Sequence, residues 1–394
     1  MYNYIPLEQA ADILDSYRKP VNSKERLNLI KGKPLDELFP YYGATGQVGW
    51  IDSFLTDGEY ILLGEDGAPF LNPYAEKAYI IHGKTWVNNH AHILHSKTNN
   101  EFLCYYLNYF NYKKYVSGTT RLKLTQAQMR KIPIPNIPSD EQSRIVARIE
   151  ELFSELDKAV DTLKTTKEQL EVYRQAVLKD AFDNAQAMCE RFTPIEELLV
   201  TDRKGMSTGP FGTMLKKHEH KTTGVPMLGI ENIDSGKFID GNKIFVTPEK
   251  AAELKSFALK SGDIIISRSG TVGELCVVPP RMEGALLSTN LMRVSLDCQK
   301  VLPEYFIYLF QSKGIVLDQV KELCKGSTRI FLNQTILKQI QFPIPNVHEQ
   351  LQIINTIESR LTFCDNIEKT VDTALAQADA MRQSILKQAF EGTL

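Results

Sequence analysis

Three histidines and one glycine-rich segment are the first residues to weigh for chemistry in this 394-residue chain. His90, His92 and His95 could hold a metal ion, but no cysteine or carboxylate lies close in sequence to complete the ligand shell. Polar strand positions explain them better. The segment Gly43–Gly49 resembles a nucleotide-binding loop only superficially, because it does not match G-x-G-x-x-G and no clear βαβ unit surrounds it.

Catalytic motifs are also missing from the sequence. Asp57, Glu65 and Asp66 could be imagined as nuclease carboxylates, but no matching lysine motif follows them, and turn positions explain them better. The chain has no Walker A sequence and no N-P-P-Y tetrapeptide of the kind that amino methylation requires. We therefore expect a protein that is not an enzyme by itself and that uses no cofactor and no metal.

Basic and amide side chains beside small residues mark a different kind of site. Lys and Arg neutralise phosphates, and Arg, Lys, Gln and Thr can contact base edges. For any one of these residues, an ordinary solvated loop is the alternative interpretation. The candidates for DNA contact are Arg18, Lys19, Lys24, Tyr42, Thr45 and Gln47 in the first half of the chain, and Ser207, Thr208, Thr213, Lys216, Lys217 and Arg268 in the second.

An internal repeat organises the chain. G-T-T-R-L at 118–122 returns as G-S-T-R-I at 326–330, and I-P-I-P-N at 132–136 returns as F-P-I-P-N at 342–346. Each copy is followed by a shared E-Q and later by closely similar ten-residue segments that begin at Tyr173 and Met381. Arg121 and Arg329 are equivalent in the repeat. They are predicted to contact phosphate or to brace the junction between domain and helix.

The repeated module is predicted to be a long helix. Proline is absent between Pro138 and Pro194 and after Pro345, and apolar residues recur in steps of three and four, as in a coiled coil. A long helix with one apolar stripe needs a partner, so we expect the two helices to pair antiparallel; packing of each helix on its own domain is the alternative. The expected seam includes Leu170, Tyr173 and Val177, and Cys364, Ala378 and Met381.

Both globular halves mix short strands with turns. Gly58–Gly67 and Gly262–Gly270 are predicted to contain buried strands, and 101–107 and 303–309 are predicted to be aromatic helical segments. The expected fold class is α+β, with two similar domains joined by two long antiparallel coiled-coil helices in a pseudo-two-fold internal repeat. The expected boundaries are 1–132 for the first domain, 133–185 for the first helical region, 186–342 for the second domain and 343–394 for the second helical region.

Composition limits the class of protein without naming it. A net charge of −2 and a pI near 6.4 argue against a uniformly basic nucleic-acid binder, but local patches decide specific binding. Six scattered cysteines suit reduced thiols. No apolar stretch is long enough to cross a bilayer and the first residues lack a signal-peptide pattern. The expected location is the cytoplasm, without membrane contact.

The arrangement resembles the specificity subunits of Type I restriction-modification enzymes. The resemblance covers essentially the whole chain and rests on P-I-P, E-Q and a long helix, present twice. Further support comes from Pro40–Gly46, 62–67 and 86–92 in the first half, and from 209–213 and 264–273 in the second.

The resemblance implies that each half is a target-recognition domain for one part of a split site in double-stranded DNA. The helices would set the spacer and dock modification (methyltransferase) subunits, and restriction (endonuclease/translocase) subunits would join them. Methylation and cleavage would occur on these partners. The alternative is a protein–protein scaffold that does not contact DNA, which the net acidity favours slightly.

Overall fold

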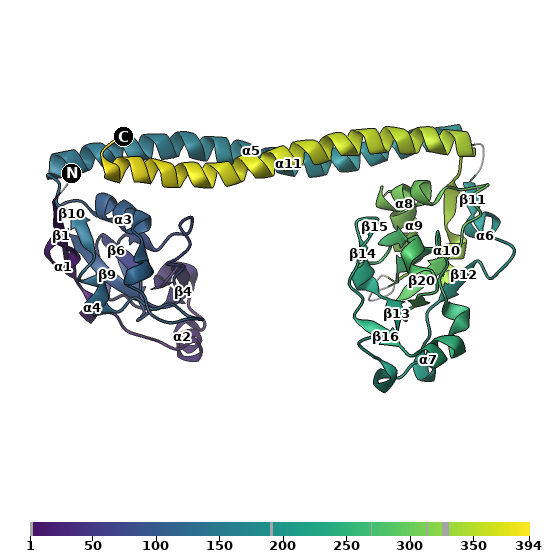
Figure 1. Ribbon diagram of the computed structural model, residues 1–394, viewed down its shortest axis with the longest axis horizontal. Coiled ribbons are helices and arrows are strands. Elements are labelled where there is room, and N and C mark those ends of the chain that lie inside the picture. The colour runs from purple at the N-terminus through teal and green to yellow at the C-terminus, as the bar shows by residue number, and fades with distance from the viewer. Residues whose placement is uncertain (1–2, 190–191, 269, 313, 325–330) are drawn as a thin grey trace. The chain divides into compact units, whose positions relative to one another are not determined.

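The protein divides into two compact units that share two long helices. The computed structural model describes residues 3–189, 192–268, 270–312, 314–324 and 331–394. Unit 1 comprises the chain up to Thr165 together with Thr370–Leu394, and unit 2 is Thr166–Lys369. Helices α5 (Ser139–Met188) and α11 (Val347–Glu391) each contribute one part to each unit (Figure 1).

The globular part of unit 1 is a mixed α+β domain. Its four-stranded antiparallel sheet has the order β2-β9-β6-β7, and a second sheet has the order β4-β3-β8-β5, in which β3 and β8 are parallel. Helix α3 packs on β6, β7 and β9. The elements are β1 (Tyr4–Pro6), α1 (Leu7–Ala10), β2 (Ala11–Ile13), η1 (Asp15–Tyr17), α2 (Ser23–Ile30), η2 (Leu35–Glu37), β3 (Phe39–Gly43), β4 (Gly46–Ile51), β5 (Thr56–Asp57), β6 (Tyr60–Gly64), β7 (Ala78–Ile81), β8 (Lys84–Val87), β9 (Ala91–Ser96), α3 (Asn100–Tyr109), η3 (Tyr112–Lys114), α4 (Gln126–Met129) and β10 (Pro133–Pro135).

The globular part of unit 2 follows the same plan. Its four-stranded sheet has the order β12-β20-β17-β18, and β13 lies between antiparallel β16 and parallel β19. The elements are β11 (Phe192–Pro194), α6 (Ile195–Leu198), β12 (Met206–Thr208), η4 (Gly212–Met214), η5 (Lys217–Glu219), β13 (Val225–Leu228), η6 (Ile230–Asn232), β14 (Ile233–Asp234), β15 (Lys237–Phe238), β16 (Ile244–Val246), α7 (Pro248–Glu253), η7 (Lys255–Phe257), β17 (Ile264–Ser267), β18 (Leu275–Val277), η8 (Pro280–Met282), β19 (Leu286–Leu287), β20 (Leu291–Val294), α8 (Pro303–Gln311), α9 (Ile315–Leu323), α10 (Gln334–Gln339) and β21 (Gln341–Pro343).

The matching strand orders show that the internal repeat is structural. β2, β9, β6 and β7 correspond to β12, β20, β17 and β18, and the β1–β10 ladder corresponds to β11–β21. The strands expected within 58–67 and 262–270 are β6 and β17, and the expected aromatic helices are α3 and α8. The two domains therefore share one α+β fold, as expected, and differ in insertions such as α2 in the first and the β14–β15 hairpin in the second.

Within each unit, α5 and α11 pair antiparallel. In unit 1, Arg382 forms an ion pair with Asp157. In unit 2, the Arg174 guanidinium lies 2.6 Å from Asp365, and that of Arg360 lies 3.3 Å from Asp180. Later positions on α5 thus meet earlier positions on α11, which confirms the expected antiparallel pairing.

The predicted seam was wrong at Ala159 on α5 and at one equivalent turn of both helices. Tyr173 is 45% exposed and Met381 is 54% exposed. The next residues, Arg174 and Arg382, reach the partner helix instead and pair with its carboxylates. An arginine can cover apolar surface with its aliphatic stem while its guanidinium meets a charge, so a polar residue fills the seam position. Cys364 occupies its predicted position and is fully buried.

A repeated tyrosine fixes each domain to the helices. Tyr106 donates a hydrogen bond to the Pro133 carbonyl at 2.7 Å, and Tyr305 donates one to the Pro343 carbonyl at 2.7 Å. The Tyr106 ring packs edge-on against Phe390 at 5.2 Å, as Tyr305 does against Phe182 at 5.3 Å. The end of α11 therefore completes the core of the first domain, and the end of α5 completes that of the second.

The glutamine of each repeated E-Q pair is a buried brace at the same junction. Gln142 donates to the Ile137 carbonyl and accepts from the Thr98 hydroxyl. Gln350 donates to the Pro345 and Lys300 carbonyls and accepts from the Leu302 amide. The sequence repeat thus preserves a set of hydrogen bonds that joins each domain to its helix.

No helix in the described ranges is apolar over a stretch long enough to span a bilayer.

Candidate nucleic-acid interface

Four loops of the first domain lie together beside β6 and β9. We call residues 43–46, 65–67, 88–90 and 117–123 loop cluster 1. The Asn88 amide donates to the Tyr42 carbonyl, and the Glu65 amide donates to the His90 carbonyl. A Cβ placed on Gly64 would approach the Ala44 carbonyl oxygen at 3.1 Å, so these loops pack closely. The structure thereby brings the turn that carries Thr45 close to the segment that carries Arg121.

The repeated G-T-T-R segment is an exposed loop with a fixed base. Ser117 and Lys123 exchange two backbone hydrogen bonds, and the Gly67 amide donates to the Leu122 carbonyl. Gly118 has a φ of +98°, and a side chain there would collide with the Arg121 carbonyl, so glycine is required. The Arg121 side chain is 59% exposed, with Nε 2.7 Å from an Asp66 oxygen. This geometry presents part of the guanidinium to solvent.

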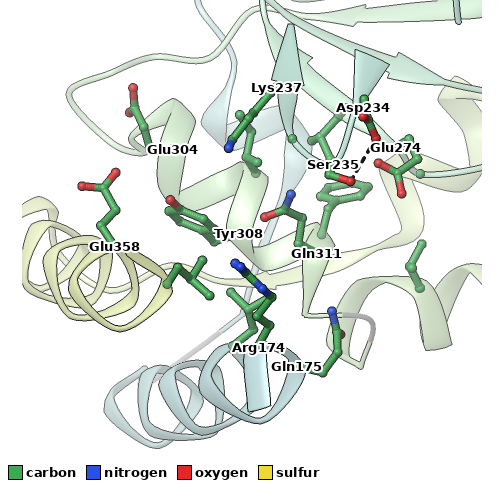
Figure 2. A pocket seen from close by; sticks show the side chains of 18 of the residues that line it. Arg174, Gln175, Asp234, Ser235, Lys237, Glu274, Glu304, Tyr308, Gln311 and Glu358 are labelled. Atoms are coloured by element: carbon green, nitrogen blue, oxygen red, sulfur yellow. Dashed lines mark hydrogen bonds between the residues drawn. The ribbon is translucent and has the colours of Figure 1, made fainter. Parts of the chain in front are cut away.

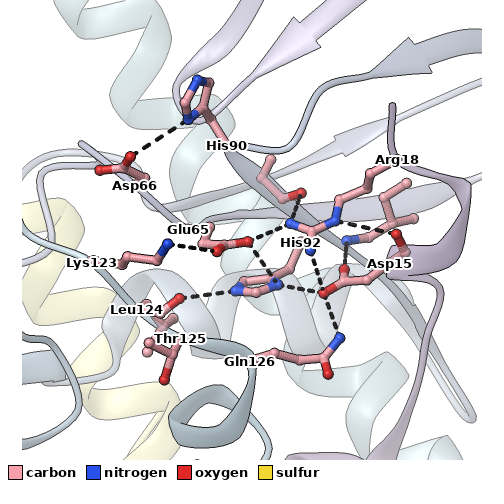
Figure 3. A network of polar contacts seen from close by, with 12 residues as sticks. Asp15, Arg18, Glu65, Asp66, His90, His92, Lys123, Leu124, Thr125 and Gln126 are labelled. Carbon is pink, nitrogen blue, oxygen red and sulfur yellow. Dashed lines mark hydrogen bonds and ion pairs between the residues drawn. The ribbon is translucent and has the colours of Figure 1, made fainter. Parts of the chain in front are cut away.

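A buried polar network lies beneath loop cluster 1 (Figure 3). Its centre is His92, which is fully buried on β9; Nδ1 lies 2.8 Å from Asp15 and Nε2 lies 3.0 Å from the Leu124 carbonyl. Arg18 bonds both Asp15 and Glu65 and is 15% exposed. All these charges are satisfied internally, so the network holds loops in place.

Two carboxyl groups of this network have shifted acidities. Burial alone would raise the pKa of Asp15, but hydrogen bonds from His92 and Gln126 and the nearby positive charges outweigh it, so the pKa is lowered. Burial likewise opposes ionisation of Glu65, whose pKa is lowered by the Arg18 hydrogen bond and by the charges of His92 and Arg18. Both groups are therefore anions in the folded domain at neutral pH.

The equivalent loops of the second domain form loop cluster 2, which we define as 207–213, 268, 288–290 and 331–332. The Thr289 hydroxyl donates to the Pro210 carbonyl, and the Arg268 amide donates to the Asn290 carbonyl. A Cβ on Gly209 would collide with the Ser288 carbonyl. The Leu332 amide donates to the Arg268 carbonyl. The same strand ends thus gather the same loops in both domains.

Several predicted contact residues of the first half are exposed. Lys24 is exposed on α2, and Thr45 and Gln47 are exposed at the β3–β4 turn, while Tyr42 is half-buried on β3. Lys19 is exposed with its ammonium 5.9 Å from the Trp86 ring centre. The structure brings Thr45 and Arg121 into loop cluster 1, whereas Lys19 and Lys24 lie outside it.

The predicted residues of the second half are more divided. Ser207 is buried in β12, Thr208 ends that strand half-buried, and Thr213 lies in η4. Lys216 and Lys217 are exposed beside η5. Arg268 donates to the carbonyls of Leu332 and Thr289 and is half-buried. Arg329 lies outside the described residues.

DNA contact by Arg18 and Arg268 stays a prediction, but both side chains have partners within their own domain. Their donors bind carboxylates or carbonyls of their own domain, which leaves little of Arg18 for a ligand. The residues that sequence reasoning missed are His92 and Asp15, which position the loops. The only sequence signal for them was the unexplained polar pattern around His92 in a strand.

Unit 2 also contains a cleft (Figure 2). Its volume is about 730 Å³, and it lies among α5, α11, α8 and the β14–β15 hairpin. Glu304, Tyr308 and Glu358 line one side, and the carboxylates around Tyr308 add to burial in raising its pKa to about 12. The cleft is thus bordered by acidic groups at the junction of domain and helices.

No group of three or more His, Cys, Asp or Glu side chains is placed to hold a metal ion within the described part of the chain.

Comparison with known proteins places the chain in a family. The family model for the type I restriction modification DNA specificity domain matches residues 9–172 and again residues 211–377. Because these two segments make up most of the sequence, the chain belongs to the type I restriction modification DNA specificity domain family. The two matches coincide with the two copies of the internal repeat, which confirms the resemblance drawn from P-I-P, E-Q and the long helices.

Individual relatives agree. The chain is 28% identical to S.HindORF215P of Haemophilus influenzae, by name a type I restriction enzyme specificity subunit, over 95% of this chain and 91% of that protein. It is 24% identical to the type I restriction enzyme EcoDI specificity subunit of Escherichia coli, over 95% of this chain and 88% of that protein. Both relatives are matched along nearly their whole length.

Solved structures share the fold. A chain from a structure of complex assembly and conformational transition in the type I R-M system superposes with a TM-score of 0.70 at 15% identity, covering 100% of this chain and 98% of that chain. The HsdS subunit of Thermoanaerobacter tengcongensis gives a TM-score of 0.53 at 15% identity, covering 100% and 97%. The expected fold class is thereby confirmed.

Proposed function

We propose that this chain is the DNA-specificity subunit of a type I restriction-modification complex, in which each globular domain contacts one part of a split target in double-stranded DNA. In this proposal the recognition domains are residues 1–132 and 186–342, and the helical regions are 133–185 and 343–394. Methylation and cleavage belong to partner subunits in the cytoplasm, and this chain performs neither.

The observation that carries the proposal is the duplicated loop cluster on a duplicated frame. Loops on a rigid scaffold can change their ligand without changing the fold. Loop clusters 1 and 2 are built on matching strand ends, yet they differ in side chains. Thr45, Gln47 and Arg121 provide exposed polar and basic groups in the first domain, suited to phosphates and base edges.

The contact residues are part of the proposal. For the first domain we keep Arg121, Thr45, Gln47, Tyr42, Lys19 and Lys24. For the second we keep Lys216, Lys217, Thr208, Thr213 and Arg329. Charge reversal of both Arg121 and Arg329 is expected to weaken DNA binding on all sequences, because phosphate contacts carry no sequence information.

The helices and the neighbouring cleft are proposed to dock the modification subunits. Val172 of α5 and Phe363 of α11 are 71% and 63% exposed in unit 2, and large apolar side chains at such exposure are typical of an interaction surface. The acidic cleft of the same unit offers Glu304 and Glu358 to a basic segment of a partner. Restriction subunits would join this assembly through the modification subunits.

A domain exchange tests the recognition role. Residues 186–342 are replaced by the corresponding domain of another specificity subunit, and the methylated sites in cells that carry the complete system are mapped. One half of the target should change while the other half stays. If both halves change, or if the complex methylates without any sequence preference, the proposal is wrong and a scaffold role becomes the better account.

A heptad deletion tests the spacer role. Removing seven residues from each helix shortens the pair by about 10 Å, because a helix rises 1.5 Å per residue. DNA covers about 3.4 Å per base pair, so the spacer between the half-sites should shorten by roughly three base pairs. An unchanged spacer contradicts this part of the proposal.

A further inference from the structure

We infer that His92 is a positioning residue for DNA reading by the first domain and that it makes recognition of one half-site depend on pH, whereas the equivalent contact in the second domain does not. The inference rests on the proposed DNA-reading function and adds a regulatory property to it. It follows from how equivalent carbonyl groups are held in the two domains.

The contacts of His92 define its protonation state. The Leu124 carbonyl can only accept a hydrogen bond, so Nε2 at 3.0 Å must carry a proton. Both oxygens of Asp15 already face donors, the Ile93 amide at one and Gln126 and Arg18 at the other. The carboxylate therefore also only accepts, and Nδ1 at 2.8 Å must carry a proton too. Both ring nitrogens are therefore donors, and His92 is held as a cation in a fully buried position.

Among the described residues, the charged groups recorded in contact with His92 belong to this network. Asp15 and Glu65 are the anions, with Glu65 3.7 Å from Nδ1. Arg18 bonds both carboxylates, and the Lys123 ammonium lies 3.3 Å from Glu65 on the side away from Arg18. When His92 loses a proton, one of its two contacts becomes an approach between two lone pairs, so that hydrogen bond is lost.

The segment that would be released carries the exposed arginine. Leu124 ends the base of the 117–123 loop, and its amide donates to the Glu65 carbonyl. Gln126 donates to the same Asp15 oxygen that His92 contacts. The remaining proton stays on Nδ1, which faces the Asp15 and Glu65 carboxylates, so the hydrogen bond that is lost is the one from Nε2 to the Leu124 carbonyl. This loss loosens the base on which Arg121 is presented.

In the second domain, the equivalent carbonyl group accepts a hydrogen bond from a side chain that does not titrate. Leu332 is the repeat equivalent of Leu124, and its carbonyl accepts from Arg268 Nε at 3.3 Å. The strand position equivalent to His92 holds Met292, which is fully buried; His92 pairs with Leu63 on β6, as Met292 pairs with Ile266 on β17. A guanidinium stays charged at every pH the protein meets, whereas an imidazole changes charge between about pH 5 and 8.

The test measures discrimination at each half-site across pH. The complex of this chain with its modification subunits is titrated from about pH 5.5 to about pH 8.5, the range of imidazole titration. Dissociation constants are measured by fluorescence anisotropy for the full target and for duplexes with bases substituted in one half. For each half-site, discrimination is the ratio of the dissociation constant of the substituted duplex to that of the full target. This ratio should fall about threefold to tenfold at the first-domain half-site as pH rises, the effect of one hydrogen bond, and should stay constant at the other half-site.

Two variants form a matched pair. His92→Gln keeps a donor that does not titrate, so discrimination at the first half-site should lose its pH dependence. Arg268→Gln should lower discrimination at the second half-site by the same factor at every pH. Because both ratios come from one protein in one buffer, a general effect of pH on folding or binding cancels.

The outcomes separate the inference from the proposed function. If specific binding persists but neither ratio changes with pH, or if both change together, the role of His92 is overturned while DNA reading stands. If the complex shows no sequence preference at any pH, the proposed function itself fails. His90 lies 3.7 Å from Asp66, which also holds Arg121, so the profile of His92→Gln is needed to assign the pH dependence to His92. If that variant keeps the wild-type profile, the role of His92 is overturned.

Discussion

Phe390 in unit 1 and Phe182 in unit 2 are equivalent residues, but their surroundings differ. Phe390 packs against the rings of Phe102, Tyr106 and Tyr109, whereas Phe182 meets the ring of Tyr305. The tyrosine–phenylalanine pair and the buried glutamine occur in both copies, while the residues that hold the loops do not. The duplicated part of this protein is therefore the frame that joins domain to helix, and each domain has its own chemistry at the recognition end.

The largest expected effect concerns the two phenylalanines. Phe390→Ala and Phe182→Ala should each lower the free energy of unfolding by about 3–5 kcal/mol, because each removes a buried ring. Trp50 and Trp86 are the only tryptophans and both lie in unit 1. In urea, Phe390→Ala should shift the tryptophan fluorescence transition, and Phe182→Ala should shift the circular dichroism transition but leave the fluorescence transition in place.

Phe363→Ala is the control for this pair, since its side chain is 63% exposed on α11 and should change stability little. Equal shifts of the fluorescence transition for both buried phenylalanines would show that the two units unfold as one, and the comparison between them would then lose its meaning.

The buried glutamines should give the next largest effect. Gln350 makes three hydrogen bonds and Gln142 makes two. Each replacement by alanine leaves buried carbonyl groups without a hydrogen-bond donor. It should lower the free energy of unfolding by about 1–3 kcal/mol, with the larger loss at Gln350. Denaturant unfolding followed by circular dichroism for Gln350→Ala, and by fluorescence for Gln142→Ala, measures both. A larger loss of stability for Gln142→Ala would mean that the number of hydrogen bonds does not determine how much each glutamine stabilises its junction.

Acid should act on unit 1 through the network below loop cluster 1. The pKa values of Asp15 and Glu65 are lowered in the folded domain. Their stabilising contribution is therefore complete above the pKa values of the unfolded chain, near about pH 4, and is lost as the pH falls through the folded values. Thermal unfolding followed by tryptophan fluorescence should show this loss, and Asp15→Asn should reduce its slope. A slope equal to that of the wild type would contradict the role of Asp15.

The smallest effect is expected at the interhelical arginines. Arg174→Gln and Arg382→Gln each remove an ion pair with an exposed aspartate, while glutamine keeps part of the aliphatic stem, so each should cost under about 1 kcal/mol. Salt should distinguish them, because Arg382 also lies over the Phe153 ring at 4.9 Å. In high salt the stability difference between Arg174→Gln and the wild type should disappear, whereas part of the stability difference for Arg382→Gln should remain. Identical salt dependence would remove this difference between the units.

The sequence was sufficient to predict the frame because its signals are local and occur twice. Steps of three and four predicted α5 and α11, and the repeated P-I-P and E-Q segments located both junctions. The seam at Tyr173 and Met381 was wrong because a neighbouring arginine can fill an apolar position.

The loops were harder to predict because their chemistry is decided by distant partners. Arg18 and Lys24 look alike in sequence, yet Arg18 meets Glu65, which is remote along the chain, while Lys24 faces solvent. Nothing near His92 in sequence indicates that Asp15 and Leu124 will meet its two nitrogens. A charge in a loop can be assigned to a ligand or to the fold only when its long-range contacts are known.

The completion of the first domain by the end of α11 has a consequence for biosynthesis. Ile385, Leu386, Ala389 and Phe390 belong to the core of unit 1, but the ribosome makes them only after the whole second domain. A nascent first domain therefore carries an uncovered apolar face during most of translation. Its final folding step must await the arrival of this late segment, and its exposure to chaperones and proteases lasts as long as that delay.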